Sequence, residues 1–282
     1  MGRIIATSPL LRWYDTHRRD LPWRHTTDPW AILVSEVMSH QTPVARVAPL
    51  WVAWMTRWPT AAAVAAAPTA EVLRAWGNLG YPRRALRLKE AAAACIDAVP
   101  TTYAGLRALP GVGDYTARAV LVFAFGQAIP VVDVNVRRVF SRLVTAHFLT
   151  PSARAGDVAR IEEWGLAAAT PAMMELGALV CTATNPTCHS CPLLPQCAWV
   201  RAGSPQPTAE QLAKRTVQKF TGTNRQVRGR IMALLRHCDG PVESATVRTV
   251  WSDGQMLTNA LDELLADGLV ERLPDGRFHL PQ

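Results

Sequence analysis

The sequence lacks an apolar run approaching the roughly 20 residues of a membrane-spanning helix. Its N-terminus also lacks the apolar core and cleavage site of a signal peptide. No internal repeat of about 20–50 residues is present, which argues against a solenoid. β-Branched runs are few in the first 200 residues, where Ala-rich and Leu-rich segments favour helices. These absences predict a cytoplasmic, mostly helical protein.

Helix boundaries are marked along this region. Thr42-Pro43 and Thr170-Pro171 each predict a helix start, with threonine as the capping residue and proline in the first turn. Gly77 and Gly126 lie where helices are expected to end.

Acidic residues are fewer than basic ones. The 282 residues include 22 Asp and Glu against 30 Lys and Arg, which gives a formal net charge of +8 and a pI near 9.6. A polyanionic partner is consistent with this balance, although many soluble proteins carry a solvated basic face. The length allows two or three modest domains with filled cores.

Cysteine is scarce but clustered. Four of the six cysteines lie in VCTATNPTCHSCPLLPQC, at Cys181, Cys188, Cys191 and Cys197, with spacings of six, two and five residues. In a reducing compartment such a cluster favours a metal site over disulfides. One CxxC knuckle with a wider arm on each side departs from a zinc ribbon and suits a 4Fe–4S cluster, although thiolate softness also admits zinc. The other two, Cys95 and Cys238, are expected to be packing residues.

A glycine-containing turn precedes an apolar helical pattern in LPGVGDYTARAVLVFAFG (109–126). Glycines at a helix N-terminus let backbone N–H groups approach a phosphate closely, so Gly111, Val112 and Gly113 are candidate phosphate contacts. With the preceding helix TTYAGLRAL the segment forms a helix-hairpin-helix, which grips the DNA backbone without reading sequence. The competing interpretation is an ordinary tight turn.

Asp133 follows the apolar run in IPVVDVNVRR and precedes a helix that contains arginines, so it could be an N-cap.

The C-terminal region has a different composition. Residues 201–215 predict a linker because they are rich in proline and polar side chains. The segment Lys214–Arg236 contains seven Lys or Arg and no acid. Helical patterns then lead to LVERLPDGRFHL, two strand-like runs around a PDG turn. Three helices and a hairpin predict a winged-helix-like module, a DNA-binding or a protein-contact unit.

Taken together, the motifs resemble the helix-hairpin-helix DNA glycosylases that carry an iron–sulfur loop, a group that includes endonuclease III and the MutY-type adenine glycosylases. The similarity covers roughly residues 8–200 and rests on RDLPWR (19–24), SEVMSHQT (35–42), GNLGYPRRA (77–85), LPGVGDYTA (109–117), VDVNV (132–136), MELGALVC (174–181) and the cysteine loop. It implies a two-lobed, mostly α fold with a 4Fe–4S cluster. The division implied by the resemblance is an iron–sulfur domain (1–27 and 128–200) and a six-helix barrel domain (28–127). The residues that follow predict by themselves the linker (201–215) and the winged-helix-like α+β module (216–282).

The resemblance also implies catalytic roles. Glu36, in the apolar helix WAILVSEVM, would be the general acid that protonates the departing purine, although a lone Glu there is otherwise a paired structural charge. Asp133 would stabilise the oxocarbenium-like sugar, with Tyr115 and Asn135 orienting the reacting groups. Bifunctional relatives carry lysine where this chain has Tyr115, and a phenol cannot form a Schiff base. Strand cleavage is therefore expected to be absent or slight.

A base inside a duplex must be flipped out before it reaches such a site. By resemblance Gln41 and Tyr81 would wedge into the vacated stack. Four further residues would line the adenine pocket, although the two arginines among them could equally be phosphate contacts: Arg19, Trp23, Arg24 and Glu175.

Two departures from the family bear on specificity. Ser39 and His40 stand where relatives commonly carry Leu-Gln, which predicts a shift in opposite-base preference. A Nudix-like C-terminal domain of many MutY-type enzymes, which reads 8-oxoguanine, is replaced here by residues 216–282.

The sequence therefore predicts a monofunctional, monomeric base-excision glycosylase, associated with the nucleoid, that removes adenine opposite 8-oxoguanine or guanine from double-stranded DNA. The alternatives are a mismatch-specific thymine or uracil glycosylase and, from another class, a non-catalytic iron–sulfur DNA-binding regulator.

Overall fold

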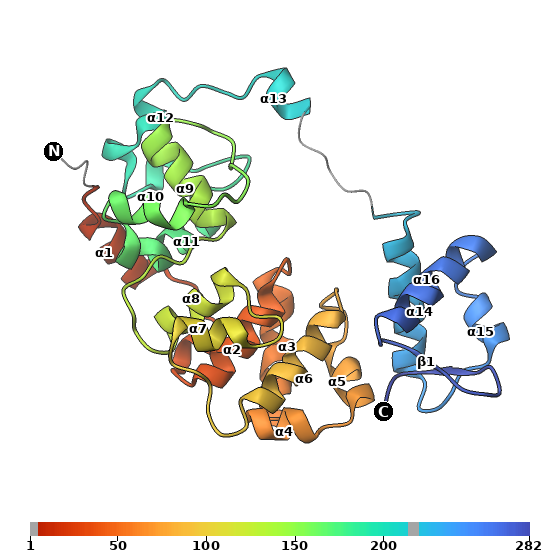
Figure 1. Ribbon diagram of the computed structural model, residues 1–282. Helices are drawn as coiled ribbons and strands as arrows, with labels where there is room; N and C mark the ends of the chain where they lie inside the picture. Colours follow the sequence, from red (N-terminus) through yellow and green to blue (C-terminus); the bar gives the residue numbers. More distant parts are fainter. Residues whose placement is uncertain (1–4, 214–219) are drawn as a thin grey trace. The chain divides into compact units, whose positions relative to one another are not determined.

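The computed structural model describes residues 5–213 and 220–282 (Figure 1). Within these ranges sixteen α-helices and one two-stranded sheet are found, which confirms the mostly helical class. No helix in the described ranges is long and apolar enough to cross a membrane. Contacts divide the chain into a first unit (1–24 and 114–216) and a second unit (25–113 and 217–282).

The described residues of the first unit form helices and connecting loops, with no β-strand. Its helices are α1 (Ser8–His17), α8 (Asp114–Phe123), α9 (Val134–Thr145), α10 (Asp157–Glu163), α11 (Thr170–Leu179), α12 (Ala198–Arg201) and α13 (Ala209–Ala213). Short 3-10 turns lie at Ala167–Ala169, Cys188–Ser190 and Leu194–Gln196.

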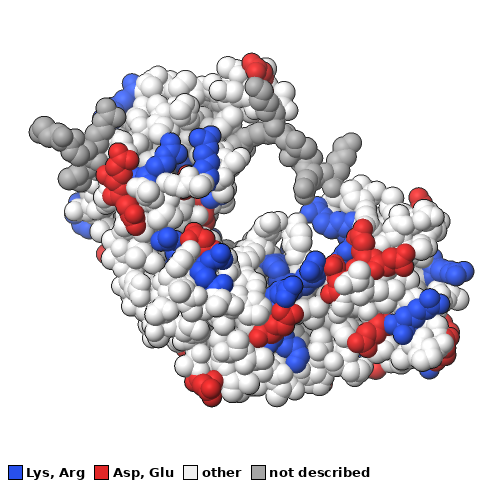
Figure 2. All heavy atoms as spheres, viewed as in Figure 1, with Lys and Arg blue, Asp and Glu red and all other residues white. Residues whose placement is uncertain are grey.

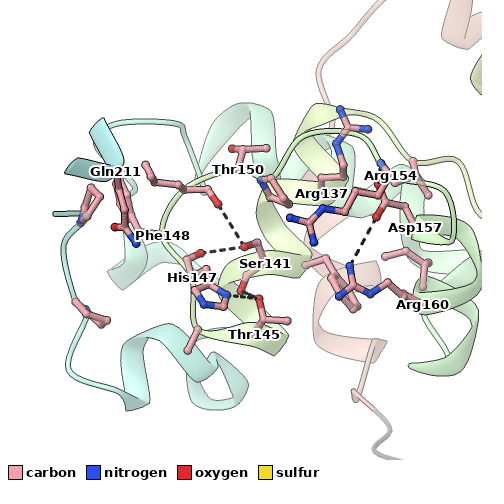
Figure 3. A pocket seen from close by; sticks show the side chains of 18 of the residues that line it. Arg137, Ser141, Thr145, His147, Phe148, Thr150, Arg154, Asp157, Arg160 and Gln211 are labelled. Carbon is pink, nitrogen blue, oxygen red and sulfur yellow. Dashed lines mark hydrogen bonds and ion pairs between the residues drawn. The ribbon is translucent and has the colours of Figure 1, made fainter. Parts of the chain in front are cut away.

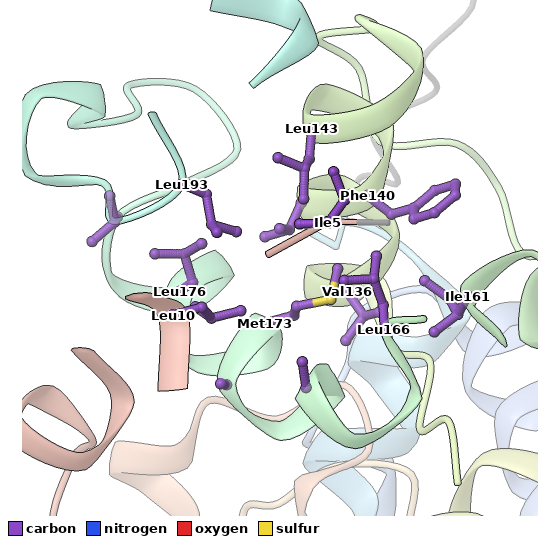
Figure 4. Packing of buried hydrophobic residues seen from close by; sticks show 14 residues of the cluster. Ile5, Leu10, Val136, Phe140, Leu143, Ile161, Leu166, Met173, Leu176 and Leu193 are labelled. Atoms are coloured by element: carbon purple, nitrogen blue, oxygen red, sulfur yellow. The ribbon is translucent and has the colours of Figure 1, made fainter. Parts of the chain in front are cut away.

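The core of the first unit forms where α9 and α11 pack together (Figure 4). On α9, Val136, Phe140 and Leu143 recur at the three- and four-residue spacing that places side chains on one helix face. They meet Met173 and Leu176 of α11, both at most 1% exposed. Full burial of such a side chain contributes about 1.5–3 kcal/mol, so this face fixes the position of the α9 N-terminus.

The second unit carries the remaining helices and the sheet. These are α2 (Pro29–Ser39), α3 (Val44–Arg57), α4 (Ala61–Ala66), α5 (Thr69–Trp76), α6 (Arg83–Ala94), α7 (Tyr103–Ala108), α14 (Asn224–His237), α15 (Ser244–Arg248), α16 (Gly254–Ala266), β1 (Glu271–Arg272) and β2 (Phe278–His279). A 3-10 turn at Pro22–His25 precedes them. Helix α5 ends at Gly77, whose φ of +55° suits glycine, as the sequence predicted.

Helices do begin next to Thr42-Pro43 and at Thr170-Pro171, but in neither case is the threonine the capping residue that the sequence predicted. Helix α3 begins at Val44, and the Thr42 hydroxyl instead donates to the carbonyl oxygen of Leu79 at 3.0 Å. Thr170 is the first residue of α11, and its hydroxyl accepts from the Val131 N–H at 3.1 Å. In both cases the threonine hydroxyl bonds to a partner far along the chain and does not cap the helix.

Residues 220–282 form three helices followed by a hairpin, drawn in blue in Figure 1. Strands β1 and β2 are antiparallel, with Glu271 opposite His279 and Arg272 opposite Phe278, which confirms the predicted hairpin. Phe278 also pairs with Val242, so the hairpin is tied to the α14–α15 connection. We call residues 220–282 the C-terminal module. Its winged-helix-like character stays a prediction.

The contact-based units differ from the predicted domains in two respects. Helix α8 belongs with the first unit, and the C-terminal module belongs with the barrel helices of the second. The described part of the predicted linker contains the short helix α13. The end of that linker and the start of the basic segment, residues 214–219, lie outside the described residues. The predicted domain boundaries stay a prediction.

Candidate functional site

Helix α2 carries Glu36 in apolar surroundings. The helix begins at Asp28, whose carboxylate accepts from the Trp30 N–H at 3.0 Å, with Pro29 in the first turn. Eight of its eleven residues are buried, including both neighbours of Glu36, whereas Glu36 itself is half-buried. The sequence thus builds a core helix that holds one ionisable group. Glu36 belongs to the second unit, and the other predicted catalytic residues belong to the first.

Asp133 and Asn135 are brought together at the start of α9. Asp133 is the N-cap, and its carboxylate accepts from the Val136 N–H and from the Asn135 side-chain amide, each at 2.7 Å. Burial raises the pKa of Asp133, and these hydrogen bonds, with the charge of Arg138, oppose the rise. The two predicted roles of Asp133, N-cap and catalytic carboxylate, are therefore compatible, because the capping hydrogen bond fixes the carboxylate.

Arg138 connects this pair to α11 and to the cysteine loop. Its buried guanidinium donates to the Asn135 side-chain oxygen and the Gly177 carbonyl oxygen, both at 2.6 Å, and to the Cys181 carbonyl oxygen at 2.7 Å. Gly177 permits the close approach, since a Cβ there would lie 2.7 Å from the Asn135 Cβ. The glycine of MELGALVC is thus explained by packing against Asn135.

The hairpin between α7 and α8 exposes both of its glycines. Gly111 has a φ of +76°, and a Cβ there would lie 2.8 Å from the Arg87 Cβ, whereas a Cβ on Gly113 would meet open space. Val112 between them is 5% exposed, and its N–H donates to the Leu109 carbonyl oxygen at 3.1 Å. Val112 therefore anchors the turn from inside. Tyr115 follows as the second residue of α8 and is half-buried.

The predicted wedge residues share a rare backbone conformation. Gln41 has a φ of 53° and Tyr81 a φ of 46°, values that side-chain-bearing residues seldom adopt. Both are exposed, Tyr81 at 45%. Such strain costs about 1–3 kcal/mol and persists where the surroundings enforce it.

The side chain of Arg84 holds the backbone of these two turns in place. Its guanidinium donates to the carbonyl oxygens of Leu79 and Gly80 at 2.9 and 3.0 Å, and to that of His40 at 2.7 Å. One side chain thus holds the turns that precede both Tyr81 and Gln41.

The two residues of predicted specificity, Ser39 and His40, lie half-buried at the end of α2. Burial, and then the charge of Arg84, lowers the pKa of His40, which favours the neutral imidazole. His40 lines a cavity of about 120 Å³ together with Arg87, Gly111 and Val112. The structure therefore brings His40 next to the hairpin.

Glu175 gathers two of the predicted pocket arginines. Its carboxylate is 1% exposed and accepts from the Arg19 backbone N–H at 2.7 Å, the Arg19 side chain at 2.8 and 3.0 Å, and Arg24 at 2.8 Å. These hydrogen bonds lower the pKa of Glu175 to about 2, against the opposing effect of burial. Trp23 is half-buried in the adjacent 3-10 turn. Glu175 thus fixes Arg19 and Arg24 in place.

The four cysteines of the loop line one small cavity, together with Arg142 and Trp199. Arg142 is 2% exposed and donates to the Cys181 Sγ at 3.3 Å and to the Thr182 carbonyl oxygen at 2.7 Å. Burial raises the pKa of Cys191 to about 11. No three His, Cys, Asp or Glu side chains of the described chain converge closely enough to hold a single metal ion. The thiols surround a cavity instead, and a soft donor set around a shared space fits a cluster.

Sequence reasoning missed Arg84, Arg138 and Arg142. A usable signal exists for the last two. Arg138 and Arg142 lie four residues apart on the amphipathic helix α9, among its apolar positions, and arginine is seldom buried there unless it is paired. Sequence reasoning also missed a cavity of about 490 Å³, which is lined by Arg137, Arg154, Arg160 and the chain at 205–208 (Figure 3). That cavity contains none of the predicted site residues.

Comparison with known proteins gives consistent results. Residues 34–155 match the HhH-GPD superfamily base excision DNA repair protein family. The chain is 52% identical to the adenine DNA glycosylase of Mycolicibacterium smegmatis over 98% of its length and 96% of the relative. It is 42% identical to human adenine DNA glycosylase over 67% of the chain and 38% of that protein.

Solved structures extend the similarity to the fold. A thermostable thymine-DNA glycosylase superposes with a TM-score of 0.60 at 27% identity, covering 70% of this chain and 95% of that one. Endonuclease III in a trapped covalent intermediate with DNA superposes with a TM-score of 0.57 at 27% identity, covering 69% and 93%.

Proposed function

Because the chain belongs to the adenine DNA glycosylases of the helix-hairpin-helix superfamily, we propose that it hydrolyses the N-glycosidic bond of adenine mispaired with 8-oxoguanine or guanine in double-stranded DNA. The observation that carries the mechanism is Glu36, the half-buried carboxyl of a helix that is otherwise largely buried. An acid in such a position is suited to donating a proton to the purine ring, which leaves poorly as an anion.

Asp133 stabilises the positive charge that develops on the sugar as the bond breaks. Its carboxylate is held by the Val136 N–H and by Asn135, so it needs no reorganisation during the reaction. Glu36 donates its proton to the purine, the glycosidic bond breaks, and adenine departs as a neutral base. Water then adds to the sugar carbon and releases a proton to solvent, Glu36 is reprotonated from solvent, and an abasic site remains. Asn135 is a positioning residue, fixed in turn by Arg138.

Tyr115 makes the enzyme monofunctional. Strand cleavage by this class of mechanism requires an amine that forms a Schiff base with the sugar, and the phenol of Tyr115 cannot do so. Tyr115 contributes to orienting the substrate.

Substrate binding begins at the hairpin and ends with base flipping. Gly111 and Gly113 present an exposed turn suited to the DNA backbone, with Val112 as its internal anchor. Gln41 and Tyr81 enter the stack that the flipped adenine vacates. Ser39 and His40 influence which opposite base is accepted.

The flipped adenine is received by Trp23 and the two arginines. Arg19 and Arg24 keep fixed orientations because Glu175 pairs with both. The enzyme works as a monomer.

The cysteine loop would hold a 4Fe–4S cluster through Cys181, Cys188, Cys191 and Cys197. When bound, the cluster fixes the fold of the loop and has no part in bond cleavage. Arg142 supports this arrangement, since burial raises the pKa of Cys181 and the charge and hydrogen bond of Arg142 oppose that rise. About four irons per chain and visible absorbance are expected, and one zinc per chain would contradict the assignment.

A mismatch thymine or uracil glycosylase is the second candidate, favoured by the fold similarity to a thymine-DNA glycosylase and by Ser39 and His40. The 52% identity to an adenine DNA glycosylase ranks it below the first.

Glu36→Gln and Asp133→Asn test the mechanism under single-turnover conditions with adenine opposite 8-oxoguanine. Both are expected to lose at least about a hundredfold in rate, as for removal of a general acid or of an electrostatic stabiliser. Glu90→Gln, at an exposed carboxylate on α6, is the control and should keep the wild-type rate. A Glu36→Gln enzyme with full activity would overturn the acid role.

A further inference from the structure

Hydrogen bonds and an ion pair connect the C-terminal module to Tyr81 and to the helices before and after it. Arg225, near the start of α14, donates to the Tyr81 hydroxyl at 3.0 Å. Two residues beyond Tyr81, Arg83 at the start of α6 pairs with Asp267 at 3.1 Å, directly after α16. A third contact runs from Arg74 of α5 to the Cys238 carbonyl oxygen at 3.0 Å, directly after α14. Helix ends of the module thus bind the turn and its flanking helices.

These contacts are supported within the module. Arg228 binds both Asp267 and Glu263, so Asp267 is held in place before it meets Arg83. The Arg225 guanidinium lies 5.3 Å from the ring centre of Phe220, a cation–π distance. Figure 2 shows acidic and basic side chains next to one another on the face drawn, in keeping with such pairs.

Tyr81 is therefore held at two levels. Inside, Arg84 and the indole N–H of Trp76 bind the carbonyl oxygen of Gly80, each at 3.0 Å, and enforce the strained backbone. Outside, Arg225 binds the hydroxyl of a ring that is 45% exposed. A side chain held in one orientation loses less conformational freedom when it inserts into a stack, so more of its contact energy drives insertion.

We propose that Arg225 is a positioning residue for base extrusion: the C-terminal module orients the wedge Tyr81 through its hydroxyl. This inference rests on the proposed wedge role of Tyr81. It assigns a task to residues 220–282 that does not require the module to read the opposite base.

A double-mutant cycle on the full chain with its cluster tests the proposal. The variants are Tyr81→Phe, Arg225→Gln and the double variant. Base extrusion is followed by the fluorescence of 2-aminopurine placed next to an adenine opposite 8-oxoguanine, and adenine release by single-turnover kinetics. Each single variant should slow extrusion roughly three- to tenfold, the effect of one lost hydrogen bond. The double variant should be no slower than either single one.

The controls separate positioning from direct DNA contact and from misfolding. Arg248→Gln, at an exposed position on α15, removes the same charge from the same module and should leave extrusion unchanged. Arg225→Lys should restore part of the rate, because an ammonium can donate to the hydroxyl. Two results together would show that Arg225 binds DNA itself and that the proposal is wrong. The effects of Arg225→Gln and Tyr81→Phe on the extrusion rate would be additive, and Arg225→Gln would lower the salt dependence of DNA affinity by about one phosphate contact.

Tyr81→Ala distinguishes failure of this inference from failure of the wedge assignment. If Tyr81→Ala leaves extrusion unchanged, Tyr81 is not a wedge and both statements fall. If Tyr81→Ala slows extrusion but Arg225→Gln and Tyr81→Phe do not, the wedge stands and the positioning role of Arg225 is overturned. Thermal unfolding is measured for every variant, to ensure that each protein is folded at the temperature of the rate measurements.

Discussion

Arg84 donates a hydrogen bond of 2.7 Å to the backbone carbonyl oxygen of His40, a residue 44 positions away. The same guanidinium binds the carbonyl oxygens of Leu79 and Gly80, and so joins the turns that carry Gln41 and Tyr81. Burial lowers the pKa of Arg84 to about 10, which leaves it charged at neutral pH. Two wedge candidates from distant parts of the chain thus depend on one side chain.

Arg84→Met should separate the two turns while retaining an apolar stem. Several charge-assisted hydrogen bonds to carbonyl groups are lost, so the free energy of unfolding is expected to fall by about 3 kcal/mol, measured by urea denaturation. Arg87→Gln, on the same helix, breaks an exposed ion pair and should change stability by less than about 1 kcal/mol. Equal losses in both variants would contradict the role of Arg84.

Asp133 should set the acidic limit of activity at a higher pH than an ordinary aspartate. Burial raises its pKa above the usual 3.8, and the carboxylate must be ionised to stabilise the sugar cation. Asn135→Ala removes a hydrogen bond that favours the ionised form, so the pKa rises further. The acidic limb of single-turnover rate against pH is then expected to move to higher pH, and a shift to lower pH would contradict this account.

Glu175 should stabilise the fold in a pH-dependent way. Its pKa of about 2 in the folded protein lies below the ordinary 4.5, so the unfolded chain binds more protons between these values. The stabilisation is full above about pH 5 and is lost as the pH falls toward 2. Glu175→Gln should reduce the free energy of unfolding at pH 7 by about 3 kcal/mol. The difference from the wild type should shrink on acidification, and a difference that stays constant down to pH 3 would be inconsistent with the shift.

The two hairpin glycines should respond differently to alanine. Gly111→Ala places a Cβ 2.8 Å from the Arg87 Cβ at a positive φ, so it should lower stability by about 1 kcal/mol or more as well as DNA affinity. Gly113→Ala meets open space, and should leave thermal unfolding unchanged while a methyl group at the exposed turn weakens binding to DNA. Affinity measured with an uncleavable adenine analogue checks both. Unchanged affinity in Gly113→Ala would exclude that position from the phosphate contact.

Local patterns predicted much of this structure because they act over a few residues. The glycines and the apolar period indicated the hairpin between α7 and α8, and the PDG turn indicated the β1–β2 pair. Thr42 shows where such reasoning stops, since its hydroxyl turned to Leu79 rather than to the next helix.

The arginines show the same limit more clearly. Arg84, Arg138 and Arg225 were not predicted as positioning residues, because each has a deciding partner far away in sequence: His40 lies 44 residues from Arg84, Gly177 lies 39 from Arg138, and Tyr81 lies 144 from Arg225. No local period encodes such a contact. The resemblance to a glycosylase family named candidate site residues, whereas the groups that hold them in place came from the folded chain.

The most direct test of the central claim is single-turnover base release from duplexes with adenine opposite 8-oxoguanine, guanine or cytosine, and with thymine or uracil opposite guanine. Strand breaks are measured in each product before and after treatment with alkali. We expect fast loss of adenine opposite 8-oxoguanine, slower loss opposite guanine, and strand breaks after alkali alone. Preferential release of thymine or uracil, or strand cleavage without alkali, would contradict a monofunctional adenine glycosylase.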